Sequence, residues 1–380
     1  MEHKTLVVLA TSPLLSALLL SALLLSGCGG GSRFQADDNP GKPASVTLSP
    51  ENTGDGWATS TPEAEGLDPT TLTRIYDSIN DGVLPGVDAM LVIRNRRLVA
   101  EGYFNGYDRE TLHDLRSTGK SFTSALAGIA IDQGLMYLDE PLSQLIPNYE
   151  DFENMDDRKR AITVHHLLNM SSSLDCDDWN PGSPGNEERM YDRKDWVKFI
   201  LDLPMLQEPG TITSYCTGGV VVLGAAIAQR AGMKLDTYAE TWLFEPLGIQ
   251  SAQWRRSPDG SATGGGGLRL RPRDAAKLGG LFLDGGVWNG KRVVPESWVQ
   301  ATRVDQGSLG HYGYGLLWWK TTLDFRQQPV DLIFTSGNGG NHVIYVPSQA
   351  LVVAFTGSNY NTGRTDTPLQ VMPLVLGALR

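Results

Sequence analysis

Residues 115 to 122 read Leu115-Arg116-Ser117-Thr118-Gly119-Lys120-Ser121-Phe122, a stretch that spaces a serine and a lysine three residues apart. A serine hydroxyl is a poor nucleophile at neutral pH and needs a base within hydrogen-bond reach. Residues three apart on a helix share a face, so this spacing would place the Lys120 amine beside the Ser117 hydroxyl. Apolar residues recur at helical spacing from Phe122 to Gly134, which predicts a helix that starts at the motif.

Lys120 would have to be neutral to accept a proton. A helix N-terminus is electropositive and burial penalises charge, so both would favour the neutral amine. Taken alone, the pair is also consistent with a serine that caps a helix and a lysine that is exposed to solvent. Evidence from elsewhere in the chain is needed to separate these two interpretations.

Two further segments supply it. Between Glu208 and Gly224 a Pro-Gly turn leads into Tyr215-Cys216-Thr217 and then an apolar, helix-like run. Between Phe334 and Pro347 a glycine-rich entry, Thr335-Ser336-Gly337-Asn338, leads into a predicted strand. In this order and at these separations, the three segments resemble the serine β-lactamase and penicillin-binding-protein superfamily. The nearest resemblance is to its class-C-like branch of esterases, D-aminopeptidases and 6-aminohexanoate-dimer hydrolases.

The resemblance runs from about Gly56 to the C-terminus and includes the segments Gly265–Asp274 and Tyr312–Trp319. It implies that Ser117 is the nucleophile and that Lys120 and Tyr215 form the proton-transfer pair. A phenol with a pKa near 10 becomes a usable base only where a nearby positive charge stabilises its anion. Which of the two groups takes the proton first is left open by the sequence.

The same resemblance implies an oxyanion hole made by the backbone N–H groups of Ser117 and Asn338. It also implies substrate contacts from Thr217, Thr335, Ser336 and Gly337. Glycines beside the hole fit this role, because a residue without a side chain lets the backbone approach a ligand closely. A tight turn that opens a strand would explain the glycines equally well.

Two positions depart from the family pattern. Thr217 stands where the family usually has Asn or Ser, so no amide donor is supplied there. Thr335 stands where relatives that bind a substrate carboxylate usually keep Lys, Arg or His. The missing cation favours a short ester or a neutral amide over a penicillin.

The predicted function is therefore a serine hydrolase with a small-molecule ester or amide substrate and no cofactor. The alternatives are a non-catalytic or slowly acylating penicillin-recognising protein, and a true β-lactamase or D-peptidase. No metal is expected, because His165-His166 lack an H-E-x-x-H pattern. Gly285–Lys291 resembles a phosphate loop, but Arg292 replaces the required Ser or Thr and Asn289-Gly290 predicts a hairpin turn.

The N-terminal residues predict the compartment. An apolar stretch from Leu6 to Leu25 ends in Leu25-Ser26-Gly27-Cys28, which resembles a bacterial lipoprotein signal. The expectation is a signal peptide over residues 1–27, lipid on Cys28 and a flexible tether over 28–55. The protein would then be lipid-anchored in the bacterial cell envelope, facing the periplasm, and we expect the outer membrane as its site. A plain membrane anchor is the alternative, since the stretch is long enough to span a bilayer.

Composition predicts one catalytic unit over residues 56–380. A net charge of −11 argues against nucleic-acid binding, and 41% hydrophobic residues suffice for a large core. The predicted class is α+β, with an antiparallel sheet flanked by helices. A mostly helical subregion, at about residues 117–260, is inserted between the sheet-forming ends. The oligomeric state is left open.

The sheet would contain a hairpin over Ala89–Val99 and two strands over Leu332–Thr356. Helices over Leu67–Ile79 and Pro368–Leu379 would cover it. Of three cysteines, Cys28 is assigned to lipid, which leaves Cys176 and Cys216 as a possible disulfide in an oxidising compartment. Two separately buried thiols are the alternative.

Overall fold

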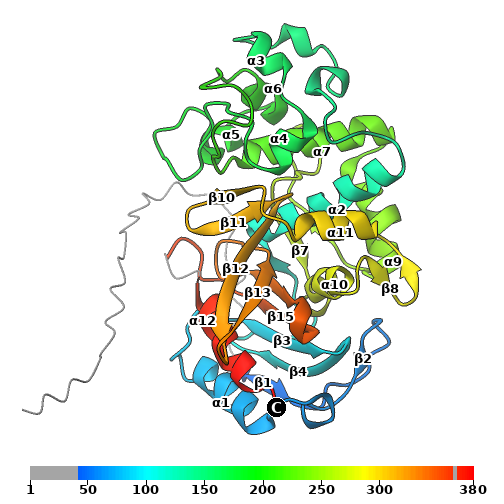
Figure 1. Ribbon diagram of the computed structural model, residues 1–380, viewed down its shortest axis with the longest axis vertical. Helices are drawn as coiled ribbons and strands as arrows, with labels where there is room; N and C mark the ends of the chain where they lie inside the picture. Colours follow the sequence, from blue (N-terminus) through cyan, green and yellow to red (C-terminus); the bar gives the residue numbers. More distant parts are fainter. Residues whose placement is uncertain (1–41, 363–365) are drawn as a thin grey trace, which may run out of the picture.

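The computed structural model describes residues 42–362 and 366–380. A large antiparallel sheet is flanked by helices, and a mostly helical subregion lies at one end of it (Figure 1). This confirms the predicted α+β class. The predicted signal peptide, the lipidation site Cys28 and the first part of the tether lie outside the described residues.

The main sheet joins both ends of the described chain. Its order is β1 (Ser45–Thr47), β4 (Arg97–Tyr103), β3 (Ala89–Arg94), β15 (Leu351–Thr356), β14 (His342–Val346), β13 (Gln328–Phe334), β12 (Trp318–Phe325), β11 (Tyr312–Gly315) and β10 (Gly307–Leu309). All neighbours along this path are antiparallel, and β2 (Ala58–Thr59) pairs in parallel with β4. Because β15 pairs with β3, the sheet is complete only when strands from the two ends of the described chain have paired.

The predicted hairpin is present as β3 and β4. Asn95 and Arg96 form its turn with φ of 50° and 66°, the left-handed conformation that two-residue hairpin turns require. A second predicted turn, Asn289-Gly290, joins the short strands β8 (Val287–Trp288) and β9 (Lys291–Arg292). The sequence therefore predicted both turns correctly from residue type.

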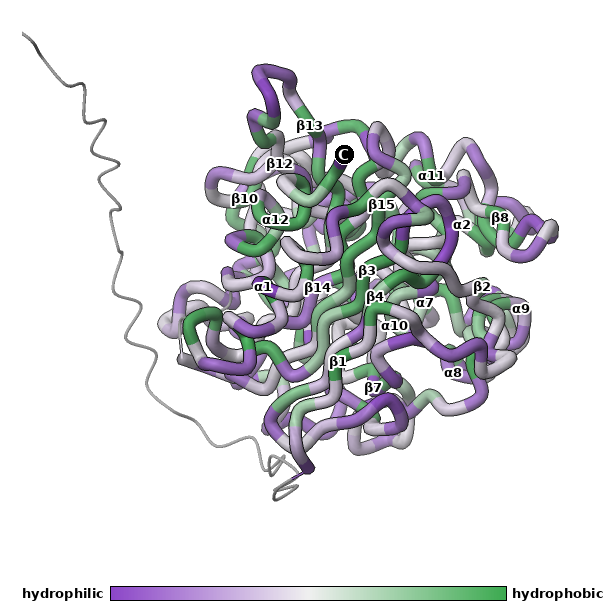
Figure 2. Tube along the Cα trace, turned by 90° about the horizontal axis from the view of Figure 1, so that it is seen from below, coloured by the Kyte–Doolittle hydropathy of each residue, from purple (hydrophilic) through white to green (hydrophobic). Residues whose placement is uncertain are grey.

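Helices cover both faces of the sheet, which is why β14 and β15 are buried along their whole length, and β3 at every position except Arg94, rather than alternating. The helix α10 (Pro272–Leu283) packs on these three strands. The helices α1 (Pro69–Asn80) and α12 (Thr367–Gly377) pack together, and α12 contacts β12. Figure 2 shows the apolar strands running between α1 and α10.

The helical subregion is organised around two buried helices, α2 (Gly119–Asp132) and α7 (Thr217–Ala231), which pack against each other. The remaining helices are short: α3 (Asp157–Arg160), α4 (Val164–Leu168), α5 (Glu187–Tyr191), α6 (Trp196–Leu201), α8 (Leu235–Ala239), a π-helical turn (Glu240–Phe244), α9 (Glu245–Leu247) and α11 (Glu296–Thr302). Within the described ranges no helix is long and apolar enough to cross a membrane.

Short 3-10 turns cover Glu63–Glu65, Arg116–Thr118, Leu142–Gln144, Tyr149–Asp151 and Pro347–Gln349. A small sheet of β5 (His113–Asp114), β7 (Leu268–Leu270) and β6 (Gln253–Trp254) lies where the main sheet meets the helical subregion. Pairing of β5 with β7 brings the segment before Ser117 alongside the residues that follow Gly267. This small sheet therefore fixes the approach to the nucleophile.

Candidate active site

Ser117 lies in the 3-10 turn Arg116–Thr118, directly before α2 begins at Gly119. The sequence had predicted that the helix includes the serine, and the structure corrects this by one turn. Two glycines enclose the turn. A Cβ on Gly337 would lie 2.2 Å from the Leu115 carbonyl oxygen, and one on Gly266 would lie 3.0 Å from that of Arg116. Ser117 remains partly exposed between them.

Lys120 is positioned by two acceptors. Its side chain is only 2% exposed, and Nζ donates to Ser117 Oγ at 3.0 Å and to the Gly265 carbonyl oxygen at 2.5 Å. The sequence did not predict the second acceptor. A backbone carbonyl has no signature in residue type, so no sequence pattern could have identified it.

Tyr215 completes the group. Its side chain interacts with that of Ser117, and the Lys120 ammonium lies 5.0 Å from the centre of its ring. Burial raises the pKa of Tyr215, while the positive charge of Lys120 and the interaction with Ser117 oppose that rise. The structure therefore brings together all three residues that were predicted as the catalytic group.

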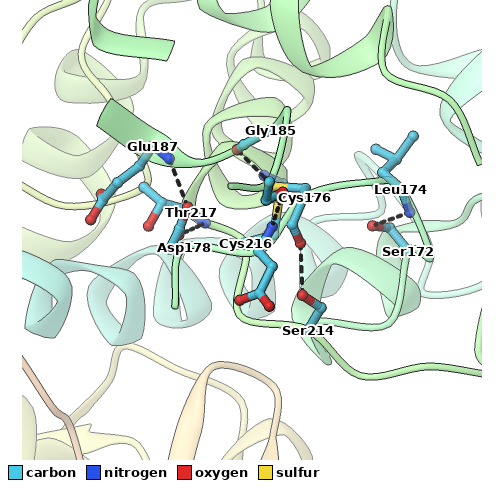
Figure 3. The surroundings of a disulfide bond; sticks show 12 residues. Ser172, Leu174, Cys176, Asp178, Gly185, Glu187, Ser214, Cys216 and Thr217 are labelled. Atoms are coloured by element: carbon cyan, nitrogen blue, oxygen red, sulfur yellow. Dashed lines mark hydrogen bonds between the residues drawn. A yellow bond between two sulfur atoms is a disulfide. The ribbon is translucent and has the colours of Figure 1, made fainter. Parts of the chain in front are cut away.

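A disulfide fixes the segment that carries Tyr215. Cys176 and Cys216 are bonded, with their Cα atoms 5.4 Å apart (Figure 3). Ser214 Oγ donates to the Cys176 carbonyl oxygen at 2.7 Å, which adds a second link between the two segments. The residues on both sides of Tyr215 are thus tied to the loop that follows Cys176.

Aromatic side chains surround the Tyr215 ring. Trp179 stacks on it with ring centroids 5.4 Å apart and an interplanar angle of 4°, and Trp319 of β12 lies at 5.8 Å. A cavity of about 320 Å³ borders Tyr215 and Trp179, between the loop after Cys176 and the residues Ser308–Gly310. Its lining contains no Lys, Arg or His.

The third predicted segment reaches the nucleophile through Thr118. Thr118 Oγ1 donates to the Asn341 carbonyl oxygen at 2.7 Å and lies 3.0 Å from Thr335 Oγ1. These contacts and the close approach of Gly337 hold the strand entry against the Ser117 turn. Asn338, whose N–H was predicted as an oxyanion donor, is held by Asn361: its Nδ2 donates to Asn361 Oδ1 at 2.6 Å, and its Oδ1 accepts from the Asn361 N–H at 3.0 Å.

Two residues that were predicted as substrate contacts are buried. Thr335 is fully buried and its Oγ1 accepts from the Val343 N–H at 2.8 Å, so the side chain is engaged inside the protein. Thr217 is 2% exposed and its side chain faces the Gly265 backbone, where a Cβ would lie 2.7 Å from Thr217 Cγ2. Ser336 is partly exposed beside the buried Gly337.

The two adjacent histidines lie away from this group. They are part of α4, where the Thr163 N–H donates to His166 Nδ1 at 3.1 Å and His165 Nε2 lies 2.7 Å from Gln306 Oε1. In the part of the chain that the structure describes, no three His, Cys, Asp or Glu side chains are grouped so that they could hold a metal ion.

Comparison with known proteins agrees with this geometry. Residues 72–370 match the family model described as Beta-lactamase. The chain belongs to the β-lactamase family. Among curated relatives, the 6-aminohexanoate-dimer hydrolase of Paenarthrobacter ureafaciens is 26% identical over 258 residues, which covers 62% of this chain and 64% of that protein.

Solved structures share the fold. A class C β-lactamase from Rhodobacter sphaeroides superposes with a TM-score of 0.60 at 19% identity, covering 82% of this chain and 99% of the other. EstCE1, described as a hydrolase with promiscuous acyltransferase activity, gives a TM-score of 0.64 at 18% identity, covering 81% and 99%. The family thus contains hydrolases that differ in the substrates their names state.

Proposed function

We propose that the protein is a serine hydrolase that forms an acyl-enzyme on Ser117. The observation that carries this proposal is the 3.0 Å hydrogen bond from the buried Lys120 Nζ to Ser117 Oγ, with the side chain of Tyr215 beside them. A nucleophile within hydrogen-bond reach of a base, itself oriented by a third group, is the arrangement that nucleophilic catalysis needs.

The chemistry follows from these contacts. Ser117 Oγ attacks the substrate carbonyl carbon while its proton passes to the Lys120–Tyr215 pair. The resulting oxyanion is stabilised by the backbone N–H groups of Ser117 and Asn338, since fixed donors there act where the charge develops. The pair returns the proton to the leaving alcohol or amine. Water then releases the acyl group from Ser117 by the same steps.

Short esters or neutral amides are the proposed substrates. Support comes from Thr335, which is buried beside Thr118 and places no cation at the strand entry next to the Ser117 turn. The name of the Paenarthrobacter relative, 6-aminohexanoate-dimer hydrolase, is compatible with this class.

Substitution of Ser117 tests the proposal. We expect Ser117→Ala to abolish hydrolysis of p-nitrophenyl butyrate, because it removes the nucleophile and little else. A fluorophosphonate should label the wild type at Ser117, as read by intact-mass and peptide mass spectrometry. The matched control is Ser121→Ala, which removes the next hydroxyl along, one that donates to the Leu317 carbonyl oxygen. Labelling at another serine, or activity retained in Ser117→Ala, would overturn the proposal.

We also propose that the mature protein is lipid-anchored through Cys28 and faces the periplasm. Support comes from the Leu25-Ser26-Gly27-Cys28 junction and from a disulfide, which persists in oxidising compartments. Metabolic labelling with palmitate should mark the wild type, and Cys28→Ser should remove the label. A labelled Cys28→Ser protein would contradict this assignment.

A further inference from the structure

Asp178 connects the loop after Cys176 to both neighbours of Cys216. Its Oδ2 accepts from the Thr217 N–H at 2.6 Å, and its Oδ1 accepts from the Glu187 N–H at 2.8 Å (Figure 3). Its own N–H donates to the Tyr215 carbonyl oxygen at 2.8 Å. One residue therefore binds the main chain directly before and directly after Cys216, at the start of α7.

The arrangement needs both oxygens of an ionised carboxylate. Each oxygen accepts a different N–H group, and a carboxylate is the side chain that offers two acceptors and no donor. An amide would present its NH2 group to one of the two N–H groups and lose that bond, and the hydroxyl oxygen of a protonated carboxyl is a weaker acceptor than a carboxylate oxygen. The contact is thus sensitive both to substitution and to protonation.

The surroundings of Asp178 make its charge responsive to pH. Burial raises the pKa of Asp178 to about 7, the negative charge of Glu187 adds to the rise, and the positive charge of Lys120 opposes it. Glu187 in turn accepts from the Tyr191 hydroxyl at 2.6 Å. The titratable groups that face Asp178 are therefore Glu187 and Tyr191 from α5, Lys120 from α2 and Tyr215 from the segment before α7.

We propose that Asp178 is a positioning residue, whose ionised carboxylate holds the Tyr215 segment so that the phenol stays on Ser117. The disulfide limits how far the loop can move from Cys216, and Asp178 sets the position of the neighbouring peptide groups. This inference rests on the proposed function, because it assigns Asp178 a part in delivering Tyr215 to the same reaction.

A pH dependence follows. Above about pH 7 the carboxylate is ionised and accepts both N–H groups. As the pH falls through that value, protonation weakens one of the two bonds, the Tyr215 segment loosens, and turnover decreases. The acid limb of the profile of kcat against pH is therefore assigned to Asp178, and it should be absent when residue 178 cannot ionise.

Asp178→Asn tests the inference in the full-length protein with its disulfide formed. A small displacement of a catalytic group can cost about a hundredfold in rate, so we expect kcat for p-nitrophenyl butyrate to fall by about 10- to 100-fold with KM changed less than about threefold. The acid limb should disappear from the profile between pH 5 and 9. The matched control is Asp195→Asn, which changes a carboxylate that accepts the Lys198 N–H at the start of α6, remote from Tyr215.

Glu187→Gln distinguishes the effect of Glu187 on the pH profile from that of Asp178. If the acid limb survives in Asp178→Asn but is lost in Glu187→Gln, the limb belongs to Glu187 and the inference is overturned. Wild-type kcat and pH profile in Asp178→Asn overturn it as well. If Asp178→Asn does not fold, the wild-type profile decides, because a kcat that is constant from pH 5 to 8 excludes a required ionisation of Asp178.

The rate of fluorophosphonate labelling at Ser117 distinguishes this inference from the proposed function. If the wild type hydrolyses no ester or amide, the proposed function fails, and labelling still measures how well Ser117 is activated. Slower labelling in Asp178→Asn than in Asp195→Asn then supports the positioning role. Equal labelling rates refute it.

Discussion

Lys120 and Tyr215 reach the Ser117 hydroxyl from different parts of the chain, yet each is buried and each contacts the other's charge or ring. A buried phenol resists ionisation, and the neighbouring ammonium is what counteracts this effect. Neither group is therefore expected to work well without the other. Lys120 and Tyr215 are therefore expected to contribute to catalysis jointly and not independently.

Substitutions of the pair should reveal this dependence. We expect Lys120→Ala and Tyr215→Phe each to lower kcat by at least about a hundredfold, the usual scale of general-base catalysis. The double variant should be little worse than either single one, because groups that act together give non-additive losses. Steady-state kinetics on p-nitrophenyl butyrate provide the measurement, with Tyr238→Phe, a buried tyrosine bonded to Gln133, as control. Losses that multiply would show that the two groups serve separate steps.

Thr335 bears on which substrates are accepted. Because it is buried and carries no charge, we expect turnover of short esters to exceed that of penicillins and cephalosporins by at least about tenfold, roughly the effect of one lost charged hydrogen bond. The measurement is kcat/KM for p-nitrophenyl butyrate and for nitrocefin with the same preparation. Comparable values for the two would mean that another residue binds the carboxylate.

Among the elements, the entry to β14 matters most for the site, because it lies against the turn that carries the nucleophile. Gly337 permits this approach, since a side chain there would overlap the Leu115 carbonyl oxygen. The bonds of Thr118 to Asn341 and Thr335 then fix the register between the two segments. Close packing of backbone on backbone sets the position of the Asn338 N–H.

A methyl group on residue 337 should push the entry to β14 away from the turn that carries Ser117. We expect Gly337→Ala to lower kcat by about tenfold or more, because even small displacements in a catalytic site are costly. The matched control is Gly377→Ala in α12, where nothing lies within 4 Å of the added Cβ, and its kcat should equal that of the wild type. Circular dichroism checks that both variants fold. Unchanged kcat in Gly337→Ala would show that the contact relaxes without affecting the site.

Elements that residue type determines locally were predictable. The hairpin turn at Asn95-Arg96 and the start of α1 at Asp68-Pro69 follow from turn and capping preferences, and Asp68 accepts from the Thr71 N–H at 2.9 Å as such a cap requires. The strands β10 to β13 were largely missed. The outer part of β12 alternates between partly and fully exposed residues, and Pro329 near the start of β13 argues against a strand.

The site was predictable where side chains carry the chemistry. Ser117, Lys120 and Tyr215 have reactive groups at recognisable spacings, and the structure brings them together. The hydrogen bond from Lys120 to the Gly265 carbonyl oxygen and the one between the Asn338 and Asn361 side chains were not predictable. They are tertiary contacts between common chemical groups. The burial of Thr217 and Thr335 was missed for the same reason.

For the molecule as a whole, the disulfide is the only covalent cross-link in the described ranges. It closes a loop over a sequence separation of 40 residues, which includes α5 and α6. Chain-entropy arguments attribute its effect to the restricted unfolded state, and the benefit grows with the size of the loop. The helical subregion should therefore depend on it more than the sheet does.

Removal of both cysteines measures this contribution. We expect Cys176→Ala/Cys216→Ala to lower the free energy of unfolding by about 3–4 kcal/mol, the value of the chain-entropy model for a loop of this size. Urea unfolding followed by circular dichroism gives the measurement, and wild type with reductant should lose a similar amount. An unchanged midpoint after both treatments would show that the loop is held by its non-covalent contacts alone.

The pairing of β15 with β3 has a consequence for biosynthesis. As the polypeptide leaves the ribosome, Ser117, Lys120 and Tyr215 emerge well before Asn338 and the strand that pairs with β3. A nascent chain that ends before Gln328 has its nucleophile and bases but lacks the amide of Asn338 and the last strands of the sheet. We therefore expect translation intermediates that end before Gln328 not to react with a fluorophosphonate. Activity would then appear only after the last strands of the sheet have been synthesised.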